Sequence, residues 1–495
     1  MLKSIINKIS QNKYLPILSI LILTFLWLVY RLTIAINQTP ELVNGETNNI
    51  WNALKVITGK PIYSNPEAIP FEIFQYTPLS QLPIIFLAWL EDNLFQGNDF
   101  ILTLAVGRIL SIVYNLFTAI IIYKILKNHL KTQTNLAILG SLIYICFLPH
   151  HFFAIRPDSL ALLFTVSGLY FFTKAYFLQR NKSFVLSAII LAVSFFVKQD
   201  AFLISGAFGL LLLFTKNFKG LFLFSLTLLC SLGILLLVAP IIFGPFFYKS
   251  IFGGVALSMK FEQFTYILTR YITFYYLLIL LIGVSLFFII KSKTNKETKY
   301  FLLTSIIFSL FISSFTTLKE GSHINYYALP TLFGTLIIIY SFNQKYLKEN
   351  EKNKLVFYLF TPFLCLHFIF FQFFHYTSVY TKFNLSKTEH ELFLSENKMR
   401  INEIYQSELK VISFDQSAKL LIPDFILFPN SEFYGVSKFS YTSFNNKNPN
   451  QKVEFIILPS DMTIPVDYLK QFNINYKDYS PWFKSNQIHI YRNEH

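Results

Sequence analysis

Long apolar runs alternate with short polar connections over the first three quarters of the chain. Each run reaches or approaches the roughly 20 apolar residues that a helix needs to cross a bilayer. The runs fall at 15–36, 101–124, 134–153, 159–177, 183–199, 201–216, 219–243, 271–291, 299–317, 325–342 and 354–375. This pattern predicts an all-α polytopic membrane domain over residues 1–375, with about eleven transmembrane helices.

One further segment, PLSQLPIIFLAWL at 78–90, is short, contains two prolines and is followed by acidic residues. It fits either a twelfth span or a segment in the membrane interface, and charge decides between them. If 78–90 does not cross, the loops on one side hold nineteen Lys and Arg against three acids, and the opposite loops hold nine against eleven. Because basic loops stay in the cytoplasm, we predict that 78–90 lies in the interface. The N-terminus is then cytoplasmic and the first outer loop, 37–100, is extracytoplasmic.

Hydropathy falls after residue 375, where thirteen basic and thirteen acidic residues are spread over the remaining chain. A helical stretch near 387–405 precedes strand-like runs at LKVISFD, DFILFP, VEFIILP and IHIYR. We therefore predict a small soluble α/β domain over residues 376–495. The charge rule places it on the extracytoplasmic side.

The composition agrees with a membrane protein, since 54% of residues are hydrophobic and 14% are charged, whereas about a quarter of the residues of soluble proteins are charged. The net charge of +15 lies in short loops beside apolar runs, so nucleic acid is not an expected partner. Membrane lipids are the expected partners. The three cysteines, Cys146, Cys230 and Cys365, lie in apolar runs without metal-site spacing, and we predict no metal site.

Glu46 opens a short amphipathic segment in the first outer loop. Ile50, Trp51, Leu54 and Ile57 follow it at helical spacing, which predicts a helix on the membrane surface with a carboxylate in its first turn. The helix dipole stabilises a carboxylate in that position. Glu46 is therefore either an ordinary first-turn carboxylate in a solvated loop or a catalytic acid, and the local sequence leaves both open.

Two later outer connections place charges at the ends of apolar runs. Arg156 and Asp158 precede the run 159–177, where Asp158 is a helix N-cap, a catalytic carboxylate, or both. Lys198 and Gln199 lie in FFVKQDAF, which a reverse turn would also explain. A lysine on the outer face opposes the charge rule and indicates an anionic partner.

A third outer connection, TTLKEGSHINYYALP, brings Lys319, His323, Asn325 and Tyr326 close together in the chain. Neither a second His nor a Cys lies at metal-ligand spacing, so His323 is interpreted as an ordinary surface histidine. Arg31 and Arg108 lie at the outer ends of the first two spans, where snorkelling to lipid headgroups would also explain them.

Carboxylates and cations thus gather at one membrane face. The arrangement suits transfer from a lipid-linked phosphate donor, because a carboxylate can accept the proton of the attacking hydroxyl and cations stabilise the departing phosphate. We predict Glu46 and Asp158 as the catalytic residues. The predicted phosphate-binding residues are Arg31, Arg108, Arg156, Lys198 and Lys319.

The order and placement of these motifs resemble the GT-C membrane glycosyltransferases. The nearest relatives are the bacterial branch with protein mannosyltransferases and lipid A aminoarabinose transferases, and the resemblance covers roughly residues 15–375. The motifs are Gly45-Glu46, GKPIY at 59–63, QYTPL at 75–79, GRILS at 107–111, RPDSLALLF at 156–164, VKQDA at 197–201 and KEGSHINYY at 319–327.

The resemblance implies a polyprenyl-phosphate sugar as donor, no further cofactor and no metal. It also implies a catalytic base in the first outer loop, matching Glu46, and a second acid matching Asp158. The chain departs from the family pattern with Gly45 before Glu46, where Asp is common, and with Tyr-Thr-Pro at 76–78 in place of Tyr-Pro-Pro. The polar motif residues expected to contact the substrates are Tyr63, Tyr76, Gln199, Asn325 and Tyr326.

The leading hypothesis is therefore a multi-pass plasma-membrane glycosyltransferase, transferring a hexose or pentose to an extracytoplasmic glycolipid, polysaccharide or protein. One alternative is a lipid or sugar transporter or flippase. Transporters usually place ionisable residues near the bilayer midplane and contain repeats, and the sequence indicates neither. A second alternative is a membrane sensor whose C-terminal domain binds a ligand.

Overall fold

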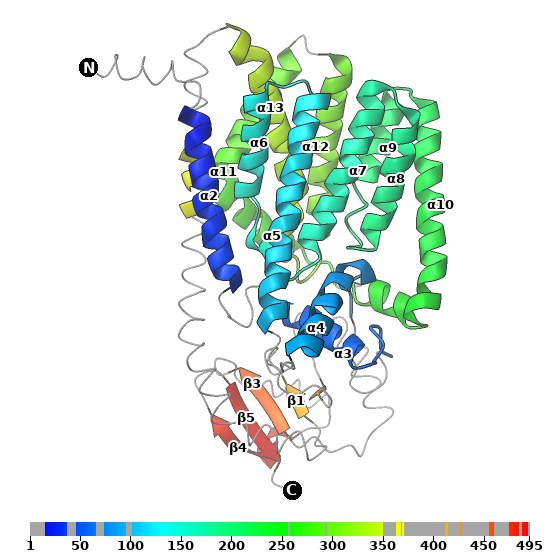
Figure 1. The fold of residues 1–495 in the computed structure, drawn as a ribbon, viewed down its shortest axis with the longest axis vertical. Coiled ribbons are helices and arrows are strands. Elements are labelled where there is room, and N and C mark those ends of the chain that lie inside the picture. Colours follow the sequence, from blue (N-terminus) through cyan, green and yellow to red (C-terminus); the bar gives the residue numbers. More distant parts are fainter. Residues whose placement is uncertain are drawn as a thin grey trace, which may run out of the picture. The chain divides into compact units, whose positions relative to one another are not determined.

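The computed structural model describes residues 15–36, 46–65, 74–95, 101–255, 258–292, 295–349, 363–367, 369–370, 411–413, 426–427, 455–459, 475–484 and 488–493 (Figure 1). The chain divides into two compact units. The helical unit contains residues 1–36, 108–235 and 259–375, and the mixed unit contains residues 37–107, 236–258 and 376–495.

Helices that run roughly along one direction make up the helical unit (Figure 1). They are α2 (Leu15–Ile36), α5 (Ile101–Lys124), α6 (Thr134–Cys146), α7 (Asp158–Leu178), α8 (Asn181–Phe195), α9 (Ser205–Phe214), α10 (Phe218–Phe243), α11 (Phe261–Lys291), α12 (Lys296–Thr317) and α13 (Ala328–Glu349). After α2, the chain returns to this unit within α5, leaves it within α10 and returns again at residue 259. Short helices η2 (Ile125–His129), η3 (His150–Phe153) and η5 (Ile324–Tyr327) lie between them.

Six helices of the described chain are long and apolar enough to cross a membrane, and four shorter helices are also apolar. The side chains of α10 are exposed in the way that lipid contact requires, with Leu237 at 72% and Ile241 at 82%. The protein is therefore a mostly helical, multi-pass membrane protein. The predicted run 201–216 contains only the ten residues of α9, because turns occupy residues 199–204. Most of the run 354–375 lies outside the described residues.

The core of the helical unit is centred on α13, which packs against α6, α11 and α12, while α7 packs against α8. Leu332, Phe333 and Leu336 of α13 are fully buried. Gly334 allows a close approach, since a Cβ at this position would lie 2.2 Å from Ile282 Cδ1 of α11. This packing fixes the helix ends from which the polar connections project.

The mixed unit contains α3 (Glu46–Ile57), η1 (Pro78–Ser80), α4 (Leu82–Phe95) and η4 (Lys249–Gly253). The segment 78–90 forms η1 and most of α4, and it is not among the six helices long enough to span. Glu91 of α4 is buried, and its two carboxylate oxygens accept hydrogen bonds from Leu102 N at 2.8 Å and Thr103 N at 2.6 Å. Glu91 thereby satisfies two amide groups of the first turn of α5.

In the part of the chain that the structure describes, five strands form one sheet in the order β2-β1-β3-β5-β4. They are β1 (Val411–Ser413), β2 (Ile426–Leu427), β3 (Phe455–Pro459), β4 (Tyr479–Lys484) and β5 (Ile488–Asn493). β1 is parallel to β2 and β3, whereas β5 is antiparallel to β3 and β4. The four predicted strand runs overlap β1, β2, β3 and β5, and β4 lies outside all four runs. The predicted helix at 387–405 lies outside the described residues.

Candidate active site

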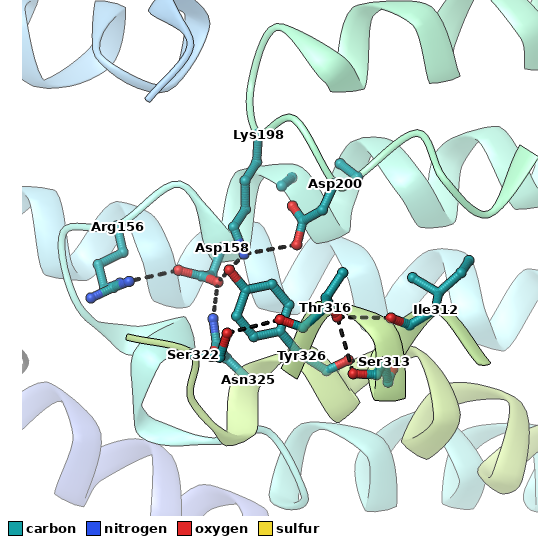
Figure 2. Close-up of polar contacts among 12 residues, drawn as sticks. Arg156, Asp158, Lys198, Asp200, Ile312, Ser313, Thr316, Ser322, Asn325 and Tyr326 are labelled. Atoms are coloured by element: carbon teal, nitrogen blue, oxygen red, sulfur yellow. Dashed lines mark hydrogen bonds and ion pairs between the residues drawn. The ribbon is translucent and has the colours of Figure 1, made fainter. Parts of the chain in front are cut away.

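A carboxylate at the first residue of α7 is the centre of a buried polar cluster in the helical unit. Asp158 Oδ1 accepts hydrogen bonds from Lys198 Nζ at 3.0 Å and from Asn325 Nδ2 at 2.5 Å. Asp158 Oδ2 accepts one from Arg156 Nε at 3.2 Å. Figure 2 shows the three side chains converging on this carboxylate, which is 2% exposed. With Asp200, these four residues are called the Asp158 cluster below.

The interpretation of Asp158 as a helix N-cap is wrong. The helix α7 begins at Asp158 itself, its N-cap position is Pro157, and no side-chain capping bond forms there. The carboxylate instead joins three connections, since Arg156 follows η3, Lys198 follows α8 and Asn325 lies in η5.

The helix α5 holds the connection that carries Arg156. Asn115 Nδ2 donates to Phe152 O at 2.5 Å, and Ser111 Oγ donates to Ala154 O at 2.8 Å. Both donors are buried and lie one turn apart on α5. The backbone before α7 is therefore fixed by side chains of a membrane helix, which the local sequence of the connection does not reveal.

Lys198 is shared between two carboxylates. Its Nζ lies 3.0 Å from Asp158 Oδ1 and 3.2 Å from Asp200 Oδ2, and it lies 4.5 Å from the centroid of the Tyr326 ring. Burial opposes the charge of Lys198, but the attraction of Asp158 and Asp200 outweighs it, and the pKa of Lys198 lies well above its usual value. The anionic partner predicted for this lysine is thus found within the protein.

Lys319 lies beside the cluster and is partly buried. Burial is the main cause that lowers the pKa of Lys319 to about 8; the charge of Lys198 lowers it further and that of Asp200 opposes the shift. In the free protein, the charged form of Lys319 is therefore less favoured than it is in water. An anion bound beside Lys319 would raise its pKa again.

The backbone around Lys319 is paired with the start of α11. Lys319 forms an isolated antiparallel bridge with Met259, and Lys260 N donates to Leu318 O at 2.7 Å. Gly321, at a φ of 75°, then turns the chain back toward η5. This turn carries the chain from Lys319 to Asn325.

Three histidine rings, those of His150, His151 and His323, lie close together beside the Asp158 cluster and are called the histidine group below. The ring centroids of His150 and His151 are 4.2 Å apart, and those of His151 and His323 are 5.1 Å apart. Burial, together with two nearby arginines, lowers the pKa of His323 to about 4. The interpretation of His323 as an ordinary surface histidine is wrong, because its half-buried ring lies against the buried ring of His151. The adjacent pair His150 and His151 is the feature of the sequence that could have indicated this group.

In the mixed unit, Glu46 is the first residue of α3, and its side chain is fully buried. The interpretation of Glu46 as an ordinary carboxylate in a solvated loop is therefore wrong, because its side chain is buried. Further polar side chains of α3 are also buried, and Asn49 Oδ1 accepts a hydrogen bond from Gln81 Nε2 at 2.7 Å. Polar contacts within the mixed unit thus help to hold α3.

Two of the predicted substrate contacts, Tyr63 and Tyr76, bond to each other. Tyr63 is 1% exposed, its hydroxyl donates to Tyr76 O at 2.9 Å, and its ring packs edge-on against Phe247. These contacts give Tyr63 a packing role within the mixed unit.

The two remaining predicted cations are buried in the helical unit, with Arg31 at 2% and Arg108 at 0% exposure. The Arg31 guanidinium lies 4.3 Å from the Phe153 ring centroid and 5.3 Å from that of Trp27. Such burial does not fit snorkelling. Gln199 lies half-buried in the turn after Lys198. Among the described residues, no group of three or more His, Cys, Asp or Glu could hold a metal ion.

Comparison with known proteins connects this arrangement with membrane glycosyltransferases. Residues 85–243 match the family model described as dolichyl-phosphate-mannose-protein mannosyltransferase. No curated protein matches the chain by sequence.

Two crystal structures of ArnT from Cupriavidus metallidurans are similar to the whole fold. The structure bound to undecaprenyl phosphate has a TM-score of 0.62 at 8% identity, and the apo structure has a TM-score of 0.61 at 10% identity. Each comparison covers 95% of this chain and 97% of the ArnT chain. The resemblance predicted from the sequence is therefore confirmed: residues 85–243 match a mannosyltransferase family model, and the chain has the fold of the membrane protein ArnT.

Proposed function

We propose that the protein transfers a sugar from a polyprenyl-phosphate donor to a glycolipid, polysaccharide or protein at the extracytoplasmic face of the plasma membrane. The observation that carries this proposal is the Asp158 cluster. Arg156, Lys198 and the adjacent Lys319 supply three cations against the carboxylates of Asp158 and Asp200. The surplus of positive charge suits a phosphate, and the ArnT structure of the same fold was crystallised with undecaprenyl phosphate.

The proposal includes the topology that the charge rule predicts. About eleven spans place the N-terminus in the cytoplasm and the C-terminal α/β domain, residues 376–495, outside. The connections that carry Asp158, Lys198 and Asn325 then face the extracytoplasmic side, where a flipped lipid-linked donor presents its sugar.

In the proposed reaction the acceptor oxygen attacks the anomeric carbon, and the bond between that carbon and the phosphate oxygen breaks. The bonding electrons leave with the phosphate, which becomes a polyprenyl-phosphate monoester. Glu46 accepts the hydroxyl proton, which is worth typically 10²–10⁴-fold in rate. The phosphate is a good leaving group once cations flank it, so no strong acid is required.

Asp158 has a different role in this proposal. Its two oxygens already accept three hydrogen bonds from Lys198, Asn325 and Arg156, so it is poorly suited to accept a proton. We infer that Asp158 orients these donors for the phosphate, and that Arg31, Arg108 and Lys319 complete the phosphate site. Tyr76, Gln199 and Tyr326 remain the proposed sugar or acceptor contacts, with Tyr63 supporting Tyr76.

The test incubates purified protein with a panel of labelled polyprenyl-phosphate sugars and records both donor binding and turnover. The Glu46→Gln variant keeps the shape of the side chain, and we expect it to lose about 10²-fold or more of turnover while donor binding persists. Glu262→Gln is the matched control, because Glu262 also lies in the first turn of a helix but is exposed. Near-normal turnover in Glu46→Gln would assign the base to another outer acid, such as Glu72, which lies outside the described residues. Lipid movement without turnover on any donor would favour a flippase.

A further inference from the structure

The histidine group places the imidazoles of His151 and His323 beside the cations of the Asp158 cluster. His151 is 2% exposed, and its Nδ1 is buried without a hydrogen-bond partner. A neutral imidazole presents one nitrogen as an acceptor, whereas an imidazolium donates from both nitrogens. A buried nitrogen without a partner is costly, so this position is suited to a ligand that accepts a hydrogen bond.

We propose that the His151 and His323 pair binds one proton when the product phosphate forms, so that the site holds a phosphate monoester and an imidazolium together. This inference rests on the proposed function. Its ligand class is a phosphate monoester dianion, as distinct from the phosphodiester of the donor.

The charges around the pair supply the physical reason. Arg156, Arg270 and Asp158 face His323, and the cations among them outnumber the acid. Their repulsion, added to burial, keeps His323 neutral, with a pKa of about 4. A dianion among these groups reverses the sign of the local charge and raises the pKa of a neighbouring imidazole.

The His151 ring lies against both other rings of the histidine group and faces further cations. The groups around it are His150, His323 and the charges of Arg156 and Lys198. The neighbouring rings of His151 and His323 therefore share one proton, and the loss of either ring weakens its uptake. The charge of Arg156 acts on both rings, so a phosphate bound by Arg156 would also act on the pair.

The charge balance of the reaction explains the use of such a pair. The donor is a phosphodiester with one negative charge, and the attacking hydroxyl contributes the proton that must be removed. After the glycosidic bond forms, the phosphate is a monoester with two negative charges, since its second pKa is about 6. Uptake of one proton by the imidazole pair keeps the net charge of the site unchanged across the reaction, whichever group first accepts the hydroxyl proton.

The experiment compares two lipids that differ by one ionisable oxygen. Undecaprenyl phosphate and its methyl ester are titrated into purified full-length protein in detergent micelles, at pH 6.5 and 7.5. The range ends below the pKa of Lys319, about 8. Concentrations of the monoester are corrected to the dianion. One linked proton gives a change of up to about tenfold in Kd per pH unit, and we expect the Kd of the monoester to rise several-fold while that of the methyl ester changes by less than about twofold.

Variants then test whether the His151 and His323 side chains take up the proton. His323→Gln and His151→Gln should each reduce the pH dependence of monoester binding, and unfolding temperatures check that both variants fold. If the buried His151→Gln fails to fold, His323→Gln decides. The matched control is His129→Gln, because His129 bonds to Thr173 Oγ1 at 2.7 Å, about 22 Å along α7 from Asp158.

Three results would overturn the inference. They are a monoester affinity independent of pH, an equal pH dependence for the methyl ester, and an unchanged dependence in His323→Gln. A fourth result, no binding of either lipid at any pH, would overturn the proposed function and this inference with it. The first three leave the proposed function standing, so the two failures are distinguishable.

Discussion

Replacing Asp158 with Asn removes the negative charge that three donors share. The Lys198 and Arg156 side chains are 12% and 11% exposed, so solvent would screen their uncompensated charges only in part. Losing one partner of a buried charge pair costs about 3–5 kcal/mol. Asn keeps a carbonyl oxygen that can accept one of the hydrogen bonds, so we expect Asp158→Asn to lower the free energy of unfolding by about 3 kcal/mol.

A double-mutant cycle with Lys198→Met isolates the contribution of the pair. Each single variant should lose the ion pair between Lys198 and Asp158, and the double variant should lose less than the sum, with a coupling energy of about 1.5–3 kcal/mol for a charged hydrogen bond. Unfolding is followed in mixed micelles by the fluorescence of the four tryptophans.

The chain offers a control cycle on an exposed pair. Lys260 Nζ lies 2.8 Å from Glu320 Oε1, with side chains 51% and 34% exposed, and such pairs couple by about 0.2–1 kcal/mol. If the coupling of Asp158 with Lys198 does not exceed that of Lys260 with Glu320, burial does not strengthen the central ion pair, and the Asp158 cluster does not stabilise the fold through this contact.

Three further predictions concern other parts of the chain. A bound phosphate favours the charged form of Lys319, and in the free protein this side chain loses its proton above its pKa of about 8. The affinity for the methyl ester should therefore be constant below pH 8 and fall by up to about tenfold per pH unit above it. Lys319→Arg should remove this fall. Glu91→Gln leaves one oxygen for the amides of Leu102 and Thr103, so unfolding should cost about 1–2 kcal/mol less; an unchanged free energy of unfolding contradicts this. Reporter fusions after residue 130 should report the cytoplasm and those after residue 380 the exterior, and a cytoplasmic signal at 380 contradicts the topology.

Hydropathy located the long helices because a bilayer demands a fixed length of apolar chain. The runs 101–124, 159–177 and 299–317 agree with α5, α7 and α12 to within three residues at each end. The run 271–291 starts ten residues after α11 does, because Glu262, Gln263 and Arg270 lower the hydropathy of a segment that is nevertheless helical. Polar residues therefore shorten the apolar run that is found in the sequence without ending the helix itself.

Part of the candidate site could also be predicted, since a charge at a span end is unusual enough to be noticed. Arg156, Asp158 and Lys198 were selected in this way, but the contact of Lys198 with Asp158 joins residues 40 positions apart and leaves no local pattern. The same reason hid the contact of His151 with His323. Such pairings are set by which helix ends meet, and the sequence of a single connection does not contain that information.

The bridge between Met259 and Lys319 has a consequence for entropy. Fixing the backbone of one residue costs about 1–2 kcal/mol, and at Lys319 that cost is met when the protein folds, because the pairing with Met259 and the bond from Lys260 N to Leu318 O already restrict the chain. A ligand at Lys319 then has to order only the lysine side chain. The substitution Lys260→Pro would remove the amide donor and loosen this pairing. Ligand binding would then weaken because the backbone at Lys319 is less ordered in the free protein, while Lys319 and the charges of the Asp158 cluster stay in place.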